Sequence, residues 1–488
     1  METAAARGEP SPLCGSVEYT MPQGGIMREQ IGDESIYLRI SELKKGTVQF
    51  TDSTNATRLV KEHGRDIRYN TAWKKWIVWG GTHWEIDEGG ALIHEKNLET
   101  IRNIYEELSK TNDYRERIEI EKFAMISESV RRREAAVKAA AWVKELNVTS
   151  DQLDANPWLL NVRNGTLNVL TGEFTVHRQE DMITKIAHVE YDPKADCPLW
   201  KQFIREIMDY KTDVINFVQT ASGLAITGNT EEQTMFILFG SGANGKTTFL
   251  NTILSILGDY GTATPTETFM RKTGDQITND IARLRGTRFV TTTEAEQGRR
   301  LSEPLIKKIT GNDQMTARFL YGEYFNFVPT FKIFMATNHK PVIKGTDYGI
   351  WRRIKLIPFT TRIPEEKQDK RLEDKLKKEA SGILNWLLEG TARWQKEGLV
   401  VPAAILNATN EYRGEMDVIG NFLKECCTAK EGATIRIREL FKAYADWCDD
   451  NNEHAVSERF FSLRLKEMGY EQTRTAEARF WAGLSLLA

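Results

Sequence analysis

The sequence predicts an α/β protein built around a phosphate-binding core, and three observations support this. An apolar run at 235–239 predicts a buried strand, and it leads into GSGANGKT at 240–247 and then into a helical pattern. Two further strand-like segments, 288–293 and 331–337, are each followed by a polar residue. The last 50 residues show two helical patterns and then a short strand-like segment.

Composition limits the remaining possibilities. A chain of 488 residues is too long for one ordinary core, so two to four domains are expected. The net charge is only −3, so nucleic-acid contacts must come from local basic patches. Five cysteines without metal-ligand spacing favour reduced thiols. No apolar run approaches the roughly 20 residues that span a bilayer, and the sequence therefore predicts an intracellular protein with no membrane partner.

The segment at 240–247 is a complete G-x-x-x-x-G-K-T phosphate loop. Its glycines let backbone N–H groups surround phosphate oxygens, and the following helix adds its positive N-terminal end. Lys246 is expected to reach the β and γ phosphates, and the Thr247 hydroxyl to hold Mg²⁺. The predicted nucleotide-binding residues are Gly240, Ser241, Gly242, Ala243, Asn244, Gly245, Lys246, Thr247 and Thr248.

Polar residues at two strand ends extend this site. The strand at 288–293 is followed by Glu294 and Glu296, and a carboxylate at this position can manage Mg²⁺ and the attacking water. We assign Glu294 to the metal and to water activation, with Glu296 as its neighbour or substitute. The alternative is that both are solvated acids. Asn338, after the strand at 331–337, is expected to contact the γ phosphate or position water.

Two arginines follow in the segment GIWRRIKLIPF at 349–359. In a ring-forming ATPase, an arginine here reaches the γ phosphate in the neighbouring subunit and stabilises the charge of the transition state. The hypothesis favours Arg353, with Arg352 close behind. The alternative is that both form ordinary ion pairs.

A cluster of four tryptophans lies near the N-terminus, at positions 73, 76, 79 and 84. Short alternating segments around it predict a small β-unit. Such a cluster can stack on bases, but packing in a small core is the commoner use.

These motifs together reveal a family resemblance. The set GSGANGKTTF, TTTEAE, LIKKITGNDQMTARFLYGEYFNFVPT, FKIFMATNHKP and GIWRRIKLIPF resembles the superfamily 3 helicases. The chain is most similar to the helicase half of phage and plasmid primase–helicases, which are related to the poxvirus nucleoside triphosphatase. The similarity runs from about Thr51 to the C-terminus.

The resemblance implies an AAA+-like P-loop NTPase core preceded by an α+β domain and followed by a winged helix. It further implies a ring, normally a hexamer, which hydrolyses ATP with Mg²⁺ at subunit interfaces and moves along single-stranded DNA. The expected domains are a tail at 1–48, the N-terminal α+β domain at 49–197, the ATPase at 198–400, and a linker with the winged helix at 401–488.

The family contacts DNA through a hairpin between the acidic strand and the Asn338 strand, here about 313–329. Better-known members carry Lys and His at its tip, whereas this chain has Tyr321 and Gly322 there. Tyr321 can stack on a base, with charge from Lys307, Lys308 and Arg318 nearby. The alternative is that the hairpin aromatics pack onto their own domain.

The resemblance also shapes the expected function. Full-length relatives carry a primase domain ahead of this module, and only about 50 residues precede the similarity here. We therefore expect a replicative helicase of a phage, prophage or plasmid that acts on single-stranded or forked DNA with a separate primase, in the cytoplasm of a bacterial host. The alternative is a nucleic-acid-stimulated ATPase that remodels or senses nucleic acid or protein complexes without unwinding.

Overall fold

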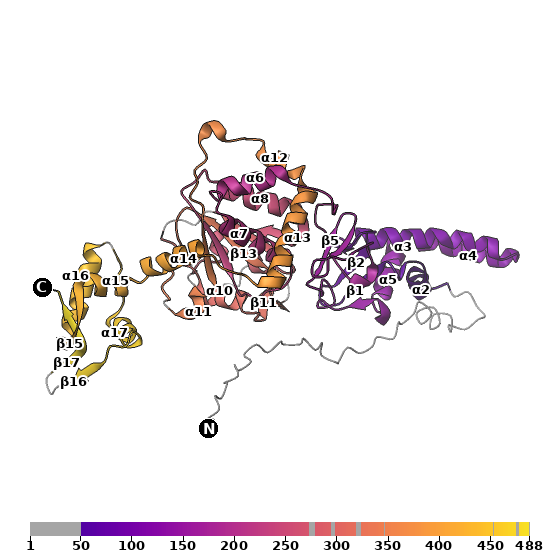
Figure 1. The fold of residues 1–488 in the computed structure, drawn as a ribbon. Helices are drawn as coiled ribbons and strands as arrows, with labels where there is room; N and C mark the ends of the chain where they lie inside the picture. Colours follow the sequence, from indigo (N-terminus) through magenta and orange to yellow (C-terminus); the bar gives the residue numbers. More distant parts are fainter. Residues whose placement is uncertain are drawn as a thin grey trace, which may run out of the picture. The chain divides into compact units, whose positions relative to one another are not determined.

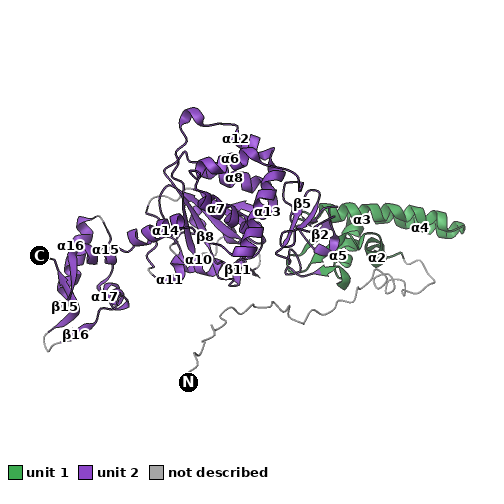
Figure 2. Cartoon of the chain, in the orientation of Figure 1, with its two compact units in different colours: residues 1–76, 87–147 green, residues 77–86, 148–488 purple. Residues whose placement is uncertain are grey.

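The structure, a computed structural model, describes residues 50–272, 279–293, 298–318, 324–345, 347–451, 453–474 and 478–487. Figure 1 shows the fold, and Figure 2 gives its two compact units different colours. The described part of the first unit comprises 50–76 and 87–147. The second comprises 77–86 and the described residues from 148 onward.

The first unit is mainly helical. Thr51 caps its first helix by accepting a hydrogen bond from the Thr54 amide at 3.2 Å. Ile101, Ile120 and Phe123 form part of a small buried cluster. Its helical elements are α2 (Asp52–His63), α3 (Ala91–Asn103), η1 (Ile104–Lys110), α4 (Tyr114–Ser127), α5 (Val130–Ala140) and η2 (Lys144–Leu146).

The tryptophan-rich segment forms strands, as predicted. They are β1 (Ile67–Asn70), β2 (Lys75–Trp79) and β3 (Trp84–Asp87), with the short β4 (Asn147–Val148) further along the chain. Trp76 and Trp84 are buried, and the Trp79 and Trp84 rings lie 5.6 Å apart. Core packing is therefore the observed use of Trp76 and Trp84.

A hairpin and two helices follow. Strands β5 (Leu159–Val162), β6 (Gly165–Asn168) and β7 (Phe174–Thr175) form an antiparallel sheet, in which Val162 pairs with Gly165. The two helices are α6 (Pro198–Ile207) and α7 (Thr212–Ala225). Asp209 and Tyr210 separate them, with φ of 54° and 56°.

A five-stranded parallel sheet forms the centre of the second unit. Its order is β14-β8-β13-β10-β9, so the strand that leads into the phosphate loop lies between β14 and β13. The strands are β8 (Met235–Phe239), β9 (Gly261–Ala263), β10 (Phe289–Thr293), β13 (Lys332–Thr337) and β14 (Ile354–Pro358). The predicted mixed α/β fold with a parallel sheet is thereby confirmed.

Both faces of this sheet are buried, which is typical of parallel sheets. On one face, Phe236 and Phe334 stack with ring centroids 4.6 Å apart, in a cluster that also holds residues of α6 to α8 and α13. Met235 and Ile237 belong to a second cluster with residues of α10 and α14. The elements around the sheet are α8 (Lys246–Leu257), η4 (Gly258–Tyr260), η5 (Thr266–Thr268), α9 (Asn279–Ala282), α10 (Glu303–Thr310), α11 (Tyr348–Trp351), η6 (Glu365–Lys367), α12 (Leu372–Lys377), α13 (Ala380–Glu397) and α14 (Ala403–Glu415).

The C-terminal segment folds around its own core. Ser457 caps the second predicted helix by accepting from the Phe460 amide at 3.3 Å, and the Tyr444 and Phe461 rings stack at 4.6 Å. Its strands form an antiparallel sheet in the order β15-β17-β16. The elements are α15 (Val418–Cys426), β15 (Cys427–Arg436), α16 (Ile437–Asp450), α17 (Glu458–Glu467), β16 (Gln472–Arg474) and β17 (Arg479–Leu486). Within the described segments, no helix combines the length and apolarity needed to cross a bilayer.

Helices α7 and α13 approach each other closely at two glycines. A Cβ at Gly390 would lie 2.1 Å from the backbone oxygen of Gln219, and a Cβ at Gly223 would lie 2.2 Å from the Thr391 nitrogen. Because both neighbours are backbone atoms, a methyl group at either position has to move a whole helix.

We predict that Gly390→Ala lowers the free energy of unfolding by about 1–3 kcal/mol, the usual cost of overpacking a core. Gly414→Ala is the matched control, since Gly414 is also helical but a Cβ there meets nothing within 4 Å. The control should gain about 0.4–1 kcal/mol, because alanine restricts the unfolded chain. Denaturant unfolding of both variants measures the difference, and equal stabilities would contradict close packing at Gly390.

Candidate functional site

The predicted phosphate loop follows β8, and α8 begins at its lysine. Gly242, Ala243 and Gly245 have φ of 99°, 49° and 81°. These left-handed conformations turn backbone N–H groups toward the concave side of the loop and form the kind of cradle that binds anions. The N-terminus of α8 adds its positive dipole end.

Lys246 lies inside this loop with a side-chain ammonium that has only neutral partners among the described residues. Its Nζ donates to Gly240 O at 2.7 Å, to Asn244 Oδ1 at 2.9 Å and to Asn338 Oδ1 at 3.1 Å. The residue is 6% exposed, and burial lowers the pKa of the ammonium. A buried cation without a carboxylate partner fits an anionic ligand, because an anion would supply the missing counter-charge.

Asn338 comes from the neighbouring strand. Strand β13 pairs with β8 in register, with Thr337 opposite Phe239, and this brings Asn338 beside the loop. The structure therefore places two of the predicted residues, Lys246 and Asn338, in direct contact. The assignment of Asn338 as a phosphate sensor stays a prediction.

Asn244 connects the loop to the residue that follows the C-terminal end of β14. Its side chain is buried, accepts from Lys246 and donates from Nδ2 to Phe359 O at 3.2 Å. The Ile363 amide also donates to Ala243 O at 2.8 Å. The loop is thus held by the segment that follows β14.

The predicted metal site is only partly described. Thr247 is exposed at the start of α8, where its hydroxyl can face a ligand, and Ser241 is exposed as well. Glu294 and Glu296 lie outside the described residues. Strand β10 ends at Thr293, which pairs with Ala336 of β13. The roles of both acids stay predictions, and the described residues contain no cluster of three His, Cys, Asp or Glu side chains suited to a metal.

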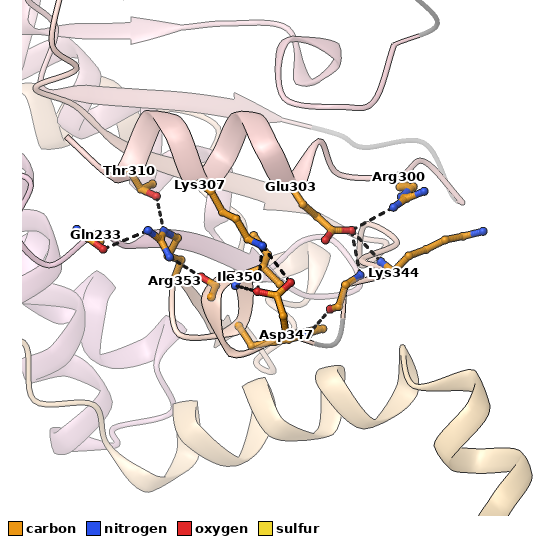
Figure 3. A network of polar contacts seen from close by, with 12 residues as sticks. Gln233, Arg300, Glu303, Lys307, Thr310, Lys344, Asp347, Ile350 and Arg353 are labelled. Atoms are coloured by element: carbon orange, nitrogen blue, oxygen red, sulfur yellow. Dashed lines mark hydrogen bonds and ion pairs between the residues drawn. The ribbon is translucent and has the colours of Figure 1, made fainter. Parts of the chain in front are cut away.

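The two predicted arginines differ sharply in their surroundings. Arg353 is 9% exposed, and its guanidinium donates to Thr310 Oγ1 at 3.0 Å, to Gln233 Oε1 at 3.2 Å and to Gly349 O (Figure 3). Burial, together with the nearby Arg352 charge, lowers the pKa of this guanidinium. Arg352 is exposed, and its Nη2 donates to the same Gln233 oxygen. Of the two side chains, only that of Arg352 lies at the surface.

Ion pairs join α10 to the segment before the arginines. Lys307 Nζ binds Asp347 Oδ1 at 2.9 Å and Oδ2 at 3.0 Å, and Glu303 Oε1 accepts from the Lys344 and Gly345 amides (Figure 3). Lys307 was predicted to lie near DNA, but its charge is already balanced by Asp347. Lys308 is exposed on the same helix and has no ion pair within the described part of the chain.

The predicted hairpin is present. Strands β11 (Met315–Arg318) and β12 (Tyr324–Phe327) pair antiparallel, with Arg318 opposite Tyr324. The Arg318 guanidinium lies 5.0 Å from the centre of the Tyr324 ring. The predicted tip residues Tyr321 and Gly322 lie outside the described residues, so their contact with DNA stays a prediction.

Sequence reasoning missed Gln233, which contacts both arginines, and the hydrogen bond from Asn244 to Phe359. Gln233 belongs to no motif, and a glutamine with a φ of 50° has no sequence signal. It also missed two buried cations. Lys332 Nζ donates to Asn229 O at 3.0 Å and to Thr227 O, and Arg288 donates to Ile226 O at 2.8 Å. Their carbonyl partners mark them as structural.

Three protein families match parts of this chain. A family described as D5 N terminal like matches residues 56–209, and one described as Poxvirus D5 protein-like matches residues 414–480. A family of unknown function matches residues 238–353, which contain the phosphate loop and the arginines. Residues 56–209 and 414–480 are therefore similar to D5-type domains. The resemblance to the poxvirus-type nucleoside triphosphatases is thereby confirmed.

Three relatives of this chain come from large DNA viruses. "Putative helicase L207/L206" of Acanthamoeba polyphaga mimivirus is 28% identical over 61% of this chain and 34% of the relative. "Putative primase C962R" of African swine fever virus is 24% identical over 73% of this chain and 39% of the relative. "Putative helicase 022R" of Frog virus 3 is 27% identical over 50% and 27% of the two chains. The chain thus spans between 27% and 39% of these relatives.

A solved structure is similar to this chain in fold. The apo structure of the NrS-1 C terminal region superposes with a TM-score of 0.50 and covers 89% of this chain and 99% of that one. The sequence identity is 9%, so the similarity concerns the fold alone.

The different burial of the two arginines predicts different effects on stability. Arg353→Ala should lower the free energy of unfolding by about 2–3 kcal/mol, because buried acceptors lose a charged donor. Arg352→Ala, the matched control at an exposed position, should change it by no more than about 0.5 kcal/mol. Denaturant unfolding in the absence of nucleotide measures both, and a larger loss for Arg352→Ala would contradict the assigned environments.

Proposed function

We propose that this chain is an ATP-hydrolysing replicative DNA helicase. The observation that supports it most strongly is the Lys246 ammonium, which is buried at the start of α8 and has only neutral acceptors among the residues that the structure describes. This arrangement suits the phosphates of a nucleoside triphosphate. Relatives that are named as helicases and a primase support a role in DNA replication.

In this proposal the bound phosphates replace the present partners of Lys246. The ammonium moves from the Asn244 and Asn338 oxygens to the β and γ phosphates, which frees Asn338 to contact the γ phosphate or orient water. Thr247 and Glu294 are the residues that would hold Mg²⁺, which would neutralise charge on the phosphates when bound. The proposal assigns Glu294 or Glu296 to activation of the attacking water.

Hydrolysis is proposed to occur between the subunits of a ring, and the family resemblance suggests six subunits. Arg352 is the better candidate for the arginine that acts in trans, because its side chain is exposed whereas the three hydrogen bonds of Arg353 keep it inside its own subunit. This reverses the preference that the sequence suggested. Arg353 then has a structural role next to Arg352.

The C-terminal segment is proposed to be a winged helix. Its support is the order α16, α17 and the hairpin of β16 and β17, packed around Tyr444, Phe461 and Trp481. Arg464 of α17 pairs with Asp417 at 3.6 Å and with Glu467 at 3.1 Å. Its charge is therefore balanced, and the exposed Arg459 on the same helix is the better candidate for phosphate contact.

A nucleic-acid-stimulated ATPase without unwinding is the second candidate, because the same loop and strand-end residues would serve it. A forked-duplex assay separates the two. ATPase activity that single strands stimulate, without strand displacement at any salt concentration, would favour the second candidate. The proposal leaves priming to a separate primase, and primer synthesis by the purified chain would overturn that part.

The phosphate-loop assignment predicts that Lys246→Ala loses nucleotide binding, ATPase activity and unwinding together. The neutral side chain removes the only cation in the loop that can reach the phosphates. Binding of a fluorescent ATP analogue, ATP turnover and displacement from a fork are the measurements. Lys122→Ala, an exposed lysine of α4, is the control and should behave as the unchanged protein. Normal binding by Lys246→Ala would exclude this loop as the site.

The trans arrangement predicts that Arg352→Ala retains nucleotide binding and loses about 10³-fold in turnover, the range observed for arginines that complete a neighbour's site. The loss should appear in kcat and leave the affinity for ATP largely unchanged. Binding titrations and steady-state kinetics measure the two quantities. Undiminished turnover by Arg352→Ala would remove this residue from the proposed interface.

A further inference from the structure

Gln233 occupies a strained position at the start of the strand that carries the phosphate loop. It lies two residues before β8 and has a φ of 50°, in the left-handed region that residues with a Cβ rarely adopt. Strained backbone of this kind persists only where the surrounding structure enforces it, and it is often found at functional sites. No motif or family role explains a glutamine at this position.

One oxygen of Gln233 serves both arginines. Its Oε1 accepts from Arg353 Nη2 at 3.2 Å and from Arg352 Nη2. An amide oxygen has two lone pairs, so it can accept both donors at once. It is also uncharged, and it holds two adjacent cations without fixing either in a strong ion pair.

The two arginines need this oxygen to different degrees. Arg353 has two other acceptors, Thr310 Oγ1 and Gly349 O, and is buried (Figure 3). The Arg352 guanidinium is exposed, and Gln233 is the side-chain partner that the structure gives it. The contact with Arg352 extends the reach of Gln233 from the buried Arg353 to a side chain at the surface.

The backbone links these residues into one unit. The Met235 amide donates to Arg353 O at 2.8 Å, and Met235 pairs with Ile354 at the start of β14. Gln233 and the arginines therefore sit at the same end of two adjacent strands. The other end of β8 leads into the phosphate loop.

We infer that Gln233 is a positioning residue that orients Arg352 toward the nucleotide site of a neighbouring subunit. Arg353 fixes the glutamine from the buried side, and Gln233 limits the conformations of the long Arg352 side chain at the surface. A guanidinium that is already oriented loses less conformational freedom when it reaches the phosphates. This inference rests on the proposed function, because it needs ATP hydrolysis at an interface between copies of this chain.

Gln233→Gly tests the role without adding strain, since glycine adopts a φ of 50° readily. Gln233→Asn is the second variant, because asparagine tolerates this conformation but is one methylene too short. Both should fold, bind nucleotide with the affinity of the unchanged protein and lose about 10- to 100-fold in kcat, the range for a misplaced catalytic group. Lys74→Gly, at an exposed residue with a φ of 55°, is the matched backbone control and should keep full turnover.

A mixing experiment shows on which site Gln233 acts. Rings assembled from Gln233→Gly and Lys246→Ala subunits contain intact phosphate loops beside intact arginines, so the ATPase rate should exceed that of either variant alone. Mixtures of Gln233→Gly with Arg352→Ala should show no such gain, because both lack a well-placed arginine. Gain in the first mixture and none in the second is the expected result.

The outcomes separate the inference from the proposed function. Native kcat in both Gln233 variants, or absence of any gain in the first mixture, would overturn the role of Gln233. A purified, unchanged protein that does not hydrolyse ATP at all would instead overturn the proposed function.

Discussion

The position of β8 between β13 and β14 is the constraint on which the candidate site depends. Because the strands are parallel and in register, the end of β8 meets the end of β13, and Asn338 reaches Lys246 at 3.1 Å. The start of β8 meets the start of β14, and there Gln233 contacts both arginines. One strand therefore carries the phosphate loop at one end and the support for the interface arginines at the other.

The buried cations of the second unit differ in their hydrogen-bond acceptors. Arg288 and Lys332 donate to backbone carbonyls, and burial lowers the pKa of both. These cations stabilise loop ends against the sheet. Lys246 donates to the backbone oxygen of Gly240 and to the side-chain amides of Asn244 and Asn338, and the exposed Asn338 side chain can rotate away. The chemistry of the acceptors, rather than burial itself, distinguishes the cation that can exchange its partners for a ligand.

Local patterns were sufficient for most of the fold and for part of the site. The strands at 235–239, 288–293 and 331–337 follow from apolar runs, which act over a few positions. The hairpin at 315–327 was expected from the family resemblance, and its two strands are present. The break between α6 and α7 has no local signal, because Asp209 and Tyr210 adopt positive φ without a glycine. The contact between Lys246 and Asn338 could be anticipated only because both follow neighbouring strands. The contacts of Gln233 with the two arginines could not be anticipated, because they arise from tertiary structure and not from a local pattern.

The two adjacent arginines show why residue type alone does not assign a role. The sequence places Arg352 and Arg353 side by side and gives no physical reason to separate them. Arg353 faces a buried hydroxyl and a carbonyl, whereas Arg352 points to solvent. A side chain that completes a site in another molecule must be able to leave its own subunit at low energetic cost, and the three hydrogen bonds of Arg353 oppose such movement. The division into one supporting and one exposed arginine therefore follows from burial, and Gln233 joins the two.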